Sequence, residues 1–147
     1  MKKKEPVLVS ACLVGIKSRY NGKDSLRRRL IQKLKKHLLI PVCPEQLGGL
    51  PTPRPKAEII GGDGKDVLEK NAAVFDEKGR DVTGNFKKGA KEVLKIARLT
   101  GSTRAFLKEK SPSCGVTMIV SGEGKIPGIG VTAAFLKKKG LDIEGVD

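Results

Sequence analysis

The chain has 147 residues, and 30 Lys and Arg stand against 16 Asp and Glu, which gives a net charge of +14. This length supports one hydrophobic core, and no run approaches the roughly 20 apolar residues that span a bilayer. The charge favours anionic partners, such as RNA or a phosphorylated substrate, over cationic ones; the alternative is that the scattered lysines are simply solvated on helix faces, as on a heat-adapted surface. Aromatic residues make up only 3% of the chain, which argues against the stacking platforms of many single-strand nucleic-acid binders.

The three cysteines are odd in number and widely separated, which argues against a disulfide framework and for a reducing compartment. The amino terminus resembles a secretory signal, because Met1 and three lysines precede an apolar stretch. Only about five apolar residues precede Cys12, however, and a signal needs roughly 7 to 15. The sequence therefore predicts a cytoplasmic protein without a membrane segment.

The first third of the chain predicts two strands around a helix. Residues 6–11 form a short buried strand, and residues 24–37 form a helix because leucines recur every four residues on one face. Residues 39–43 form the next strand, which ends at a proline.

The middle of the chain is less regular. Three prolines hold residues 51–55 in an extended loop, because each removes a donor and biases its neighbour away from helix. Residues 57–60 predict a short strand before a glycine-rich turn over 61–64. Residues 74–82 are ambiguous and are interpreted as a small hairpin.

The remainder alternates again. A helix over 83–99 is followed by strands over 103–107 and 117–121, and then by a helix over 131–139. This alternation predicts one α/β domain over residues 1–147. Its mainly parallel sheet carries helices on both faces, in a Rossmann-like, doubly wound arrangement.

The cysteines share a position in this scheme. Cys12 and Cys43 each end a predicted strand, and Cys114 lies in a loop after a third; such ends face one crevice in an open parallel sheet. Three converging thiolates suit a soft metal or an iron–sulfur cluster with one iron left open. The alternatives are small buried hydrophobes or a zinc site completed by water or Glu45. His37 ends a helix far from these loops, so we expect no imidazole ligand.

Several residues near the cysteines are candidates for catalysis. Glu45 follows Cys43 in a proline-fixed turn into the same crevice, where it could transfer protons, although most such glutamates are merely solvated. Ser111 and Ser113 precede Cys114, and either hydroxyl could hold a substrate atom or satisfy the backbone of the loop.

Further candidates for substrate binding lie elsewhere. Gly128, Gly130 and Thr132 open the last predicted helix, whose free amides could meet an anion or a carbonyl group. The alternative is a glycine turn that packs the helix against a strand. Other possible anion contacts, or ordinary surface residues, are Arg19, Tyr20 and Arg54.

Four blocks of sequence, which together span nearly the whole chain, resemble the thiouracil desulfidase family. The two most specific blocks surround the second and third cysteines. The blocks are Ser10-Ala11-Cys12-Leu13 with Arg19-Tyr20-Asn21-Gly22, then Pro41 to Arg54, then Lys110-Ser111-Pro112-Ser113-Cys114-Gly115, and Gly128 to Ala134.

The resemblance implies an enzyme that hydrolytically removes sulfur from thiolated uracil. A 4Fe-4S cluster would be held by Cys12, Cys43 and Cys114, and its fourth iron would take the substrate sulfur. Glu45 would relay a proton with help from Ser111. The substrate would be a thiolated pyrimidine base or nucleotide, or thiouridine in tRNA; the charge of the chain favours one that carries phosphate.

The chain departs from the family pattern at a few positions. Many members carry a further cysteine where this chain has Ser18, often an Asp in place of Asn21, and commonly an Asp in place of Ile129. The loss at Ser18 leaves three cluster ligands, whereas Ile129 removes a polar group and puts substrate choice in doubt. The rival hypothesis is a non-catalytic basic RNA-binding module with buried cysteines. The oligomeric state is left open.

Overall fold

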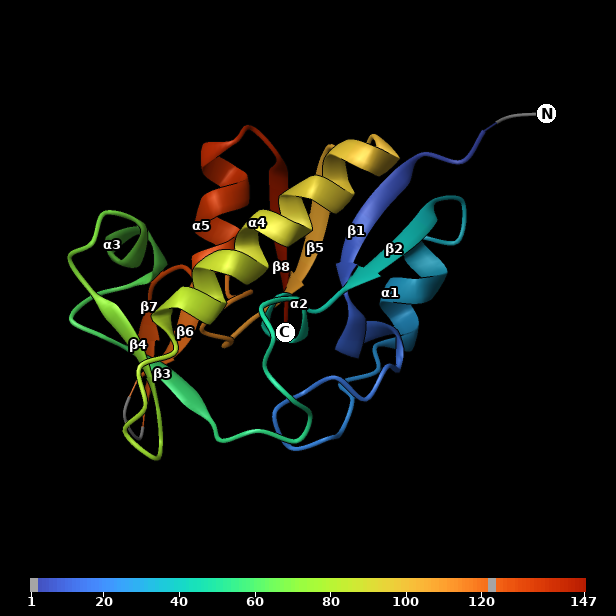
Figure 1. Cartoon of the computed structure of the whole chain (residues 1–147). Coiled ribbons are helices and arrows are strands. Elements are labelled where there is room, and N and C mark those ends of the chain that lie inside the picture. The colour runs from blue at the N-terminus through green and yellow to red at the C-terminus, as the bar shows by residue number, and fades with distance from the viewer. Residues whose placement is uncertain (1–2, 122–123) are drawn as a thin grey trace.

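The centre of the protein is a four-stranded parallel sheet. The computed structural model describes residues 3–121 and 124–147, and its main sheet has the order β2-β1-β5-β8 (Figure 1). Because β1 and β5 are flanked on both sides and covered on both faces, their middle residues form unbroken buried apolar runs. The strands are β1 (Pro6–Ser10), β2 (Leu38–Val42), β5 (Arg104–Lys108) and β8 (Asp142–Val146).

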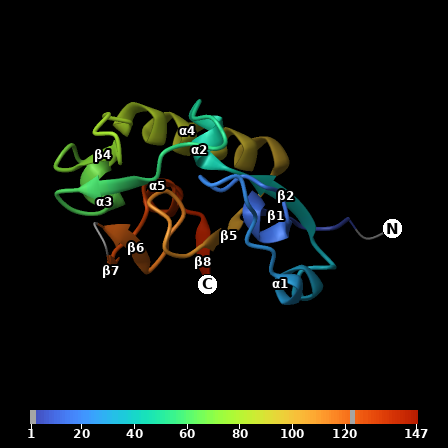
Figure 2. The same cartoon turned by 90° about the horizontal axis from the view of Figure 1, so that it is seen from below.

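Helices cover both faces of this sheet, as the fold class predicted. One core cluster joins β1 and β5 to α4 (Thr83–Thr100) and α5 (Val131–Lys138). A second joins the opposite faces of the same strands to α1 (Arg28–Lys33). Seen from below, α4 and α1 lie on opposite sides of the strands (Figure 2). The predicted α/β architecture is therefore confirmed.

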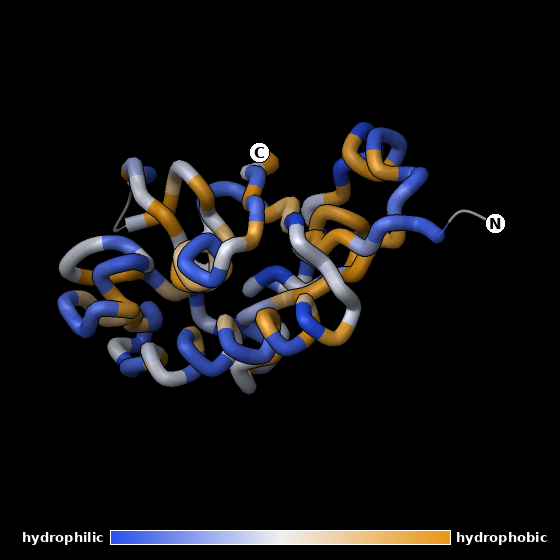
Figure 3. The backbone as a smooth tube through the Cα atoms, turned by 90° about the horizontal axis from the view of Figure 1, so that it is seen from above, coloured by the Kyte–Doolittle hydropathy of each residue, from blue (hydrophilic) through white to orange (hydrophobic). Residues whose placement is uncertain are grey.

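The helix α4 shows most clearly why this sequence folds as it does. Hydrophobic and hydrophilic residues alternate along its turns (Figure 3), and the buried positions from Phe86 to Ala97 recur with helical spacing. Gly101 ends the helix at a φ of 72°, a left-handed conformation that glycine adopts without strain. No helix in the described part of the chain is apolar and long enough to cross a bilayer.

Two antiparallel strand pairs and three short helices complete the fold. The strands β3 and β4 pair with each other, β6 pairs with β7, and a separate apolar cluster lies beneath them. These elements are the 3-10 helix η1 (Ala11–Val14), α2 (Pro44–Leu47), β3 (Ala57–Ile60), α3 (Gly64–Leu68), β4 (Ala73–Asp76), β6 (Met118–Ser121) and β7 (Gly124–Pro127).

The helix predicted over residues 24–37 is wrong at both ends, since α1 covers only Arg28–Lys33. The N–H groups of Ser25 and Arg27 donate to the carbonyls of Cys12 and Leu13 instead of joining a helix. This stretch therefore braces η1, the turn that carries the first cysteine.

The strand predicted over residues 117–121 does not belong to the main sheet, because β6 forms a hairpin with β7. The fourth main-sheet strand is β8, which the sequence analysis missed. The segment over 74–82 does turn back on itself, since the N–H of Asp76 donates to the carbonyl of Arg80, but β4 pairs mainly with β3. The turn predicted over 61–64 leads into α3, which Asp63 caps.

Candidate active site

A pocket of about 340 Å³ opens where the parallel strands end. Cys12 lies in η1 after β1, Cys43 directly follows β2, and Cys114 lies in the loop after β5, so the three come from adjacent strands. The chain order reverses between β1 and β5, which is the switch point where open α/β sheets bind ligands. All three cysteines line the pocket, and their predicted convergence is seen in the structure.

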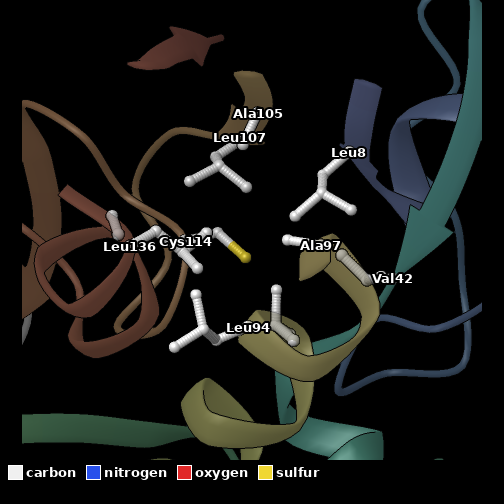
Figure 4. Packing of buried hydrophobic residues seen from close by; sticks show 10 residues of the cluster. Leu8, Val42, Leu94, Ala97, Ala105, Leu107, Cys114 and Leu136 are labelled. Atoms are coloured by element: carbon white, nitrogen blue, oxygen red, sulfur yellow. The ribbon is translucent and has the colours of Figure 1, made fainter. Parts of the chain in front are cut away.

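The three thiols are largely withdrawn from water. Burial raises the pKa of each thiol, and it raises the pKa of Cys114 to about 12. The charge of Cys43 raises the pKa of Cys12 and of Cys114 further, because the three groups lie close enough to repel one another. Figure 4 shows the Cys114 side chain among Leu107, Ala97 and other core residues. Neutral thiols in this setting need a cation or a metal to become thiolates.

The donor set fits an iron–sulfur cluster, because such clusters are held by cysteine thiolates and Cys12, Cys43 and Cys114 line one pocket. In the described part of the chain, no three Cys, His, Asp or Glu side chains are placed to hold a single metal ion. His37 is absent from the pocket lining, as the sequence analysis expected.

Cys43 is fixed by the start of α2. Its sulfur donates to the carbonyl oxygen of Ser18 at 3.7 Å, and Pro44 at the first helical position sets the turn. The helix packs closely on α4, because a Cβ on Gly89 would overlap the carbonyl oxygen of Pro44. The absence of that side chain lets α2 lie flat on α4, with Glu45 on the pocket wall.

Glu45 lines the pocket and forms an ion pair that was not predicted from the sequence. Its Oε1 accepts from Nε of Arg54 at 3.0 Å, and only 13% of the Glu45 side chain and 4% of the Arg54 side chain are exposed. Its Oε2 accepts from the hydroxyl of Ser113 at 2.9 Å. Both carboxylate oxygens are thus oriented, which is what a group that exchanges a proton with a bound substrate requires.

Arg54 is buried and contacts several protein groups, so it is not an anion contact on the surface. Besides Glu45, it donates to the carbonyl of Ser18 at 2.9 Å and to the hydroxyl of Thr52 at 2.9 Å. The Ser18 carbonyl also receives the Cys43 thiol, so Arg54 ties the second cysteine and the carboxylate to one point. Its guanidinium is committed to protein partners.

The loop after β5 that carries Cys114, called the cysteine loop below, contains two serines with different positions. The Ser113 hydroxyl contacts Glu45 and lies 3.7 Å from the Cys114 sulfur. The Ser111 oxygen accepts from the backbone N–H of Cys114 at 3.0 Å and lies 3.0 Å from the Ser113 hydroxyl. Ser111 therefore reaches Glu45 only through Ser113, although both serines line the pocket.

Arg19 and Tyr20 form part of the pocket wall. The Arg19 guanidinium lies 5.7 Å from the centre of the Tyr20 ring, and the Lys56 ammonium lies 6.0 Å from it. This aromatic ring, with two cations close to it, can pack against a planar substrate ring while the cations attract the negative charge of the substrate.

Gly128, Gly130 and Thr132 are absent from the pocket lining, so their placement does not support the substrate contact predicted for them. The N–H of Thr132 donates to the carbonyl of Ser113 at 2.9 Å, and that of Gly130 to Gly115 at 2.7 Å. A Cβ on Gly130 would lie 2.6 Å from the Ser113 carbonyl carbon. The backbone N–H groups at the start of α5 therefore hold the cysteine loop in place.

Four lysines at the pocket were not predicted from the sequence. Lys56, Lys108, Lys110 and Lys125 line it, and Lys108 and Lys110 come directly before the cysteine loop. Lys108 and Lys110 lie close to Ser111 in the sequence, which indicates that they share its site. This signal does not stand out, because the chain contains many lysines.

Two of the three departures from the family pattern, Ser18 and Ile129, lie in different places. Ser18 is 2% exposed and lines the pocket, and its hydroxyl donates to the carbonyl of Ile16. Ile129 packs on the main core cluster and lies outside the pocket lining, with its carbonyl accepting from the N–H of Gly64.

The fold and this pocket define an α/β protein with a three-thiol, carboxylate-bearing site at its strand ends. The chain belongs to the 2-thiouracil desulfurase family, whose model matches residues 7–145, and the predicted resemblance is confirmed. It is 44% identical over 140 residues to the uncharacterized protein YbbK of Bacillus subtilis (strain 168), covering 93% of each chain. A solved structure, the [4Fe-4S]-dependent thiouracil desulfidase TudS, matches with a TM-score of 0.81 at 37% identity, over 97% of this chain and 91% of that one.

Proposed function

We propose that residues 1–147 act as one desulfidase domain, which cleaves the C–S bond of a thiolated uracil by hydrolysis in the cytoplasm. The observation that carries the proposal is the pocket in which Cys12, Cys43 and Cys114 meet Glu45. The match to TudS, a [4Fe-4S]-dependent thiouracil desulfidase, supports it. We assign the three cysteines as ligands of a 4Fe-4S cluster.

The net reaction exchanges one sulfur for one oxygen. Water supplies oxygen to the carbon of the C=S group, and the sulfur leaves with the two hydrogens of that water as hydrogen sulfide, so that uracil is the product. When bound, the cluster supplies an iron without a protein ligand, a Lewis acid with affinity for the substrate sulfur.

The protein groups would orient the substrate and move the protons. The Glu45 carboxylate takes a proton from the attacking water and returns it to the leaving group, because its Oε2 faces the pocket beside Ser113. Arg54 keeps that carboxylate in place. Ser111 assists through its contact with the Ser113 hydroxyl.

The cations around the pocket favour a substrate that carries negative charge. Arg19, Lys56, Lys108 and Lys110 line the pocket, and the chain carries a net charge of +14. A thiolated nucleotide fits these charges better than the neutral base, and thiouridine in tRNA fits the same chemistry. Tyr20 offers a face to the pyrimidine ring.

The test is anaerobic purification followed by incubation with thiouracil, thiouridine nucleotides and thiolated tRNA, with sulfide and the desulfurated product measured. We expect about four irons per chain and broad absorption near 400 nm. Glu45→Gln should keep the iron and lose roughly 10² to 10⁴ fold in turnover. An active protein without iron would overturn the proposal. Salt-dependent RNA binding without iron or turnover would favour the RNA-binding alternative.

A further inference from the structure

We propose that Lys108 is the counter-charge of the thiolate-held cofactor, so that its ammonium group stabilises the cluster in the pocket and raises the reduction potential of the cluster. This inference rests on the proposed function, since it assumes that the cluster is bound.

Lys108 is held at the pocket by the sheet itself. It is the last residue of β5, and its backbone N–H donates to the hydroxyl of Ser10, the last residue of β1, at 2.9 Å. Cys12 follows Ser10 by two residues. The Lys108 side chain is only 16% exposed and lines the same pocket as Cys12. Its charge therefore acts across a partly dry space, where screening is weak.

Two of the other cations at the pocket are paired with carboxylates. Nζ of Lys110 lies 2.7 Å from a carboxylate oxygen of Asp147, whereas Nζ of Lys108 lies 4.0 Å from the same oxygen. The hydrogen bond of Lys108 Nζ at 3.1 Å goes to the neutral carbonyl of Glu109. Arg54 forms an ion pair with Glu45. Lys108 is thus a half-buried pocket cation whose charge a carboxylate offsets only weakly, from 4.0 Å.

Cys12 and Lys108 line the same pocket, and the charge of each acts on the other. Burial raises the pKa of the Cys12 thiol and lowers that of the Lys108 ammonium, because both lose water. The charge of each group counteracts this effect on the other. Arg19 acts on Cys12 in the same direction and lies over the ring of Tyr20. Three thiolates confined to this pocket need a nearby cation to offset the cost of burying their charge.

A positive charge close to an iron–sulfur cluster favours its reduced form, because reduction adds one negative charge. The experiment therefore measures the midpoint potential of the anaerobically reconstituted protein by optical redox titration, with iron content and the rate of iron loss to a chelator. The variants are Lys108→Met, Lys108→Gln and Lys108→Arg. The matched control is Lys95→Met combined with Glu92→Gln, which removes an ion pair of no net charge from the surface of α4, outside the pocket lining.

We expect Lys108→Met and Lys108→Gln to lose iron faster and to shift the potential to more negative values, with about a tenfold lower ratio of reduced to oxidised cluster at a fixed potential. Lys108→Arg and the control pair should stay near the unmodified protein. Failure of both neutral variants to take up iron, while Lys108→Arg takes up four, would also support the role.

Three results would overturn the inference: an unchanged potential and iron-loss rate in the neutral variants, a Lys108→Arg protein that behaves like them, or an equal shift in the control pair. An unmodified protein that binds no cluster would instead contradict the proposed function, so the two failures can be told apart.

Discussion

Replacing Arg54 by methionine tests whether the Glu45 carboxylate depends on a buried partner. The substitution keeps most of the side-chain volume but removes the contacts to Glu45, to the Ser18 carbonyl and to Thr52. Glu45 then keeps only the Ser113 hydroxyl as a partner. Because 4% of the arginine and 13% of the glutamate side chain are exposed, water cannot easily replace what is lost.

The expected cost follows from this burial. Removing one partner of a buried ion pair destabilises a protein by about 3 to 5 kcal/mol, because the remaining charge is left uncompensated. We expect about 3 kcal/mol here, since Ser113 still holds one carboxylate oxygen. The double variant Arg54→Met with Glu45→Met should lose less than the sum of the two single variants, by about 2 kcal/mol.

The assay is urea unfolding of the metal-free, reduced protein at neutral pH, which separates the ion pair from cofactor loss. Lys95→Met is the control, because its ion pair with Glu92 lies on the surface, with 69% of the lysine side chain exposed, and should be worth less than about 0.5 kcal/mol. A loss below about 1 kcal/mol in Arg54→Met, or full additivity in the double variant, would refute the reasoning.

Three other substitutions probe the supports of the site. Gly130→Ala should destabilise the metal-free protein by about 1 to 3 kcal/mol and impair iron uptake, because its Cβ would meet the Ser113 carbonyl; Gly84→Ala, with open space around it in α4, should not destabilise. Thr132→Val should leave turnover unchanged and raise the melting temperature, since the fully buried Thr132 hydroxyl makes no hydrogen bond. Burial raises the pKa of Glu109, but hydrogen bonds from residues 116–118 outweigh it and lower the pKa below 4.5. Glu109 therefore stabilises above that pH and loses its effect on acidification, so acid unfolding of Glu109→Gln should depend less on pH below about 5.

The sequence predicted the parts of the fold that local pattern specifies. The buried runs of β1 and β5 and the amphipathic α4 stand in the structure close to their predicted bounds. The strand β8 was missed because Asp142, Glu144 and Gly145 interrupt it, and an edge strand tolerates such residues. The helix does not begin at residue 24, because the N–H groups of Ser25 and Arg27 donate to carbonyls of η1. Helix propensity cannot predict such a contact between segments.

The candidate site was predictable where it followed from topology and not where it followed from side-chain geometry. The positions of the cysteines were predictable because each follows the end of a strand, and that of Glu45 because it lies two residues after Cys43. The link from Arg54 to Glu45 was hidden, because it depends on how the loop over 51–55 folds back over α2. Glycines at the start of a helix favoured an anion site at Gly130, whereas the structure uses the amides of that helix for the cysteine loop.

The placement of the three cysteines on strands joined by long crossovers constrains the order of biogenesis. A compact cysteine motif can capture its metal while the polypeptide is still unstructured, but here the sulfurs meet only after β1, β2 and β5 have paired. The entropy of closing those loops must be overcome by the sheet before any inorganic ligand contributes. We therefore expect maturation to begin with a folded apoprotein whose pocket receives its cofactor from outside.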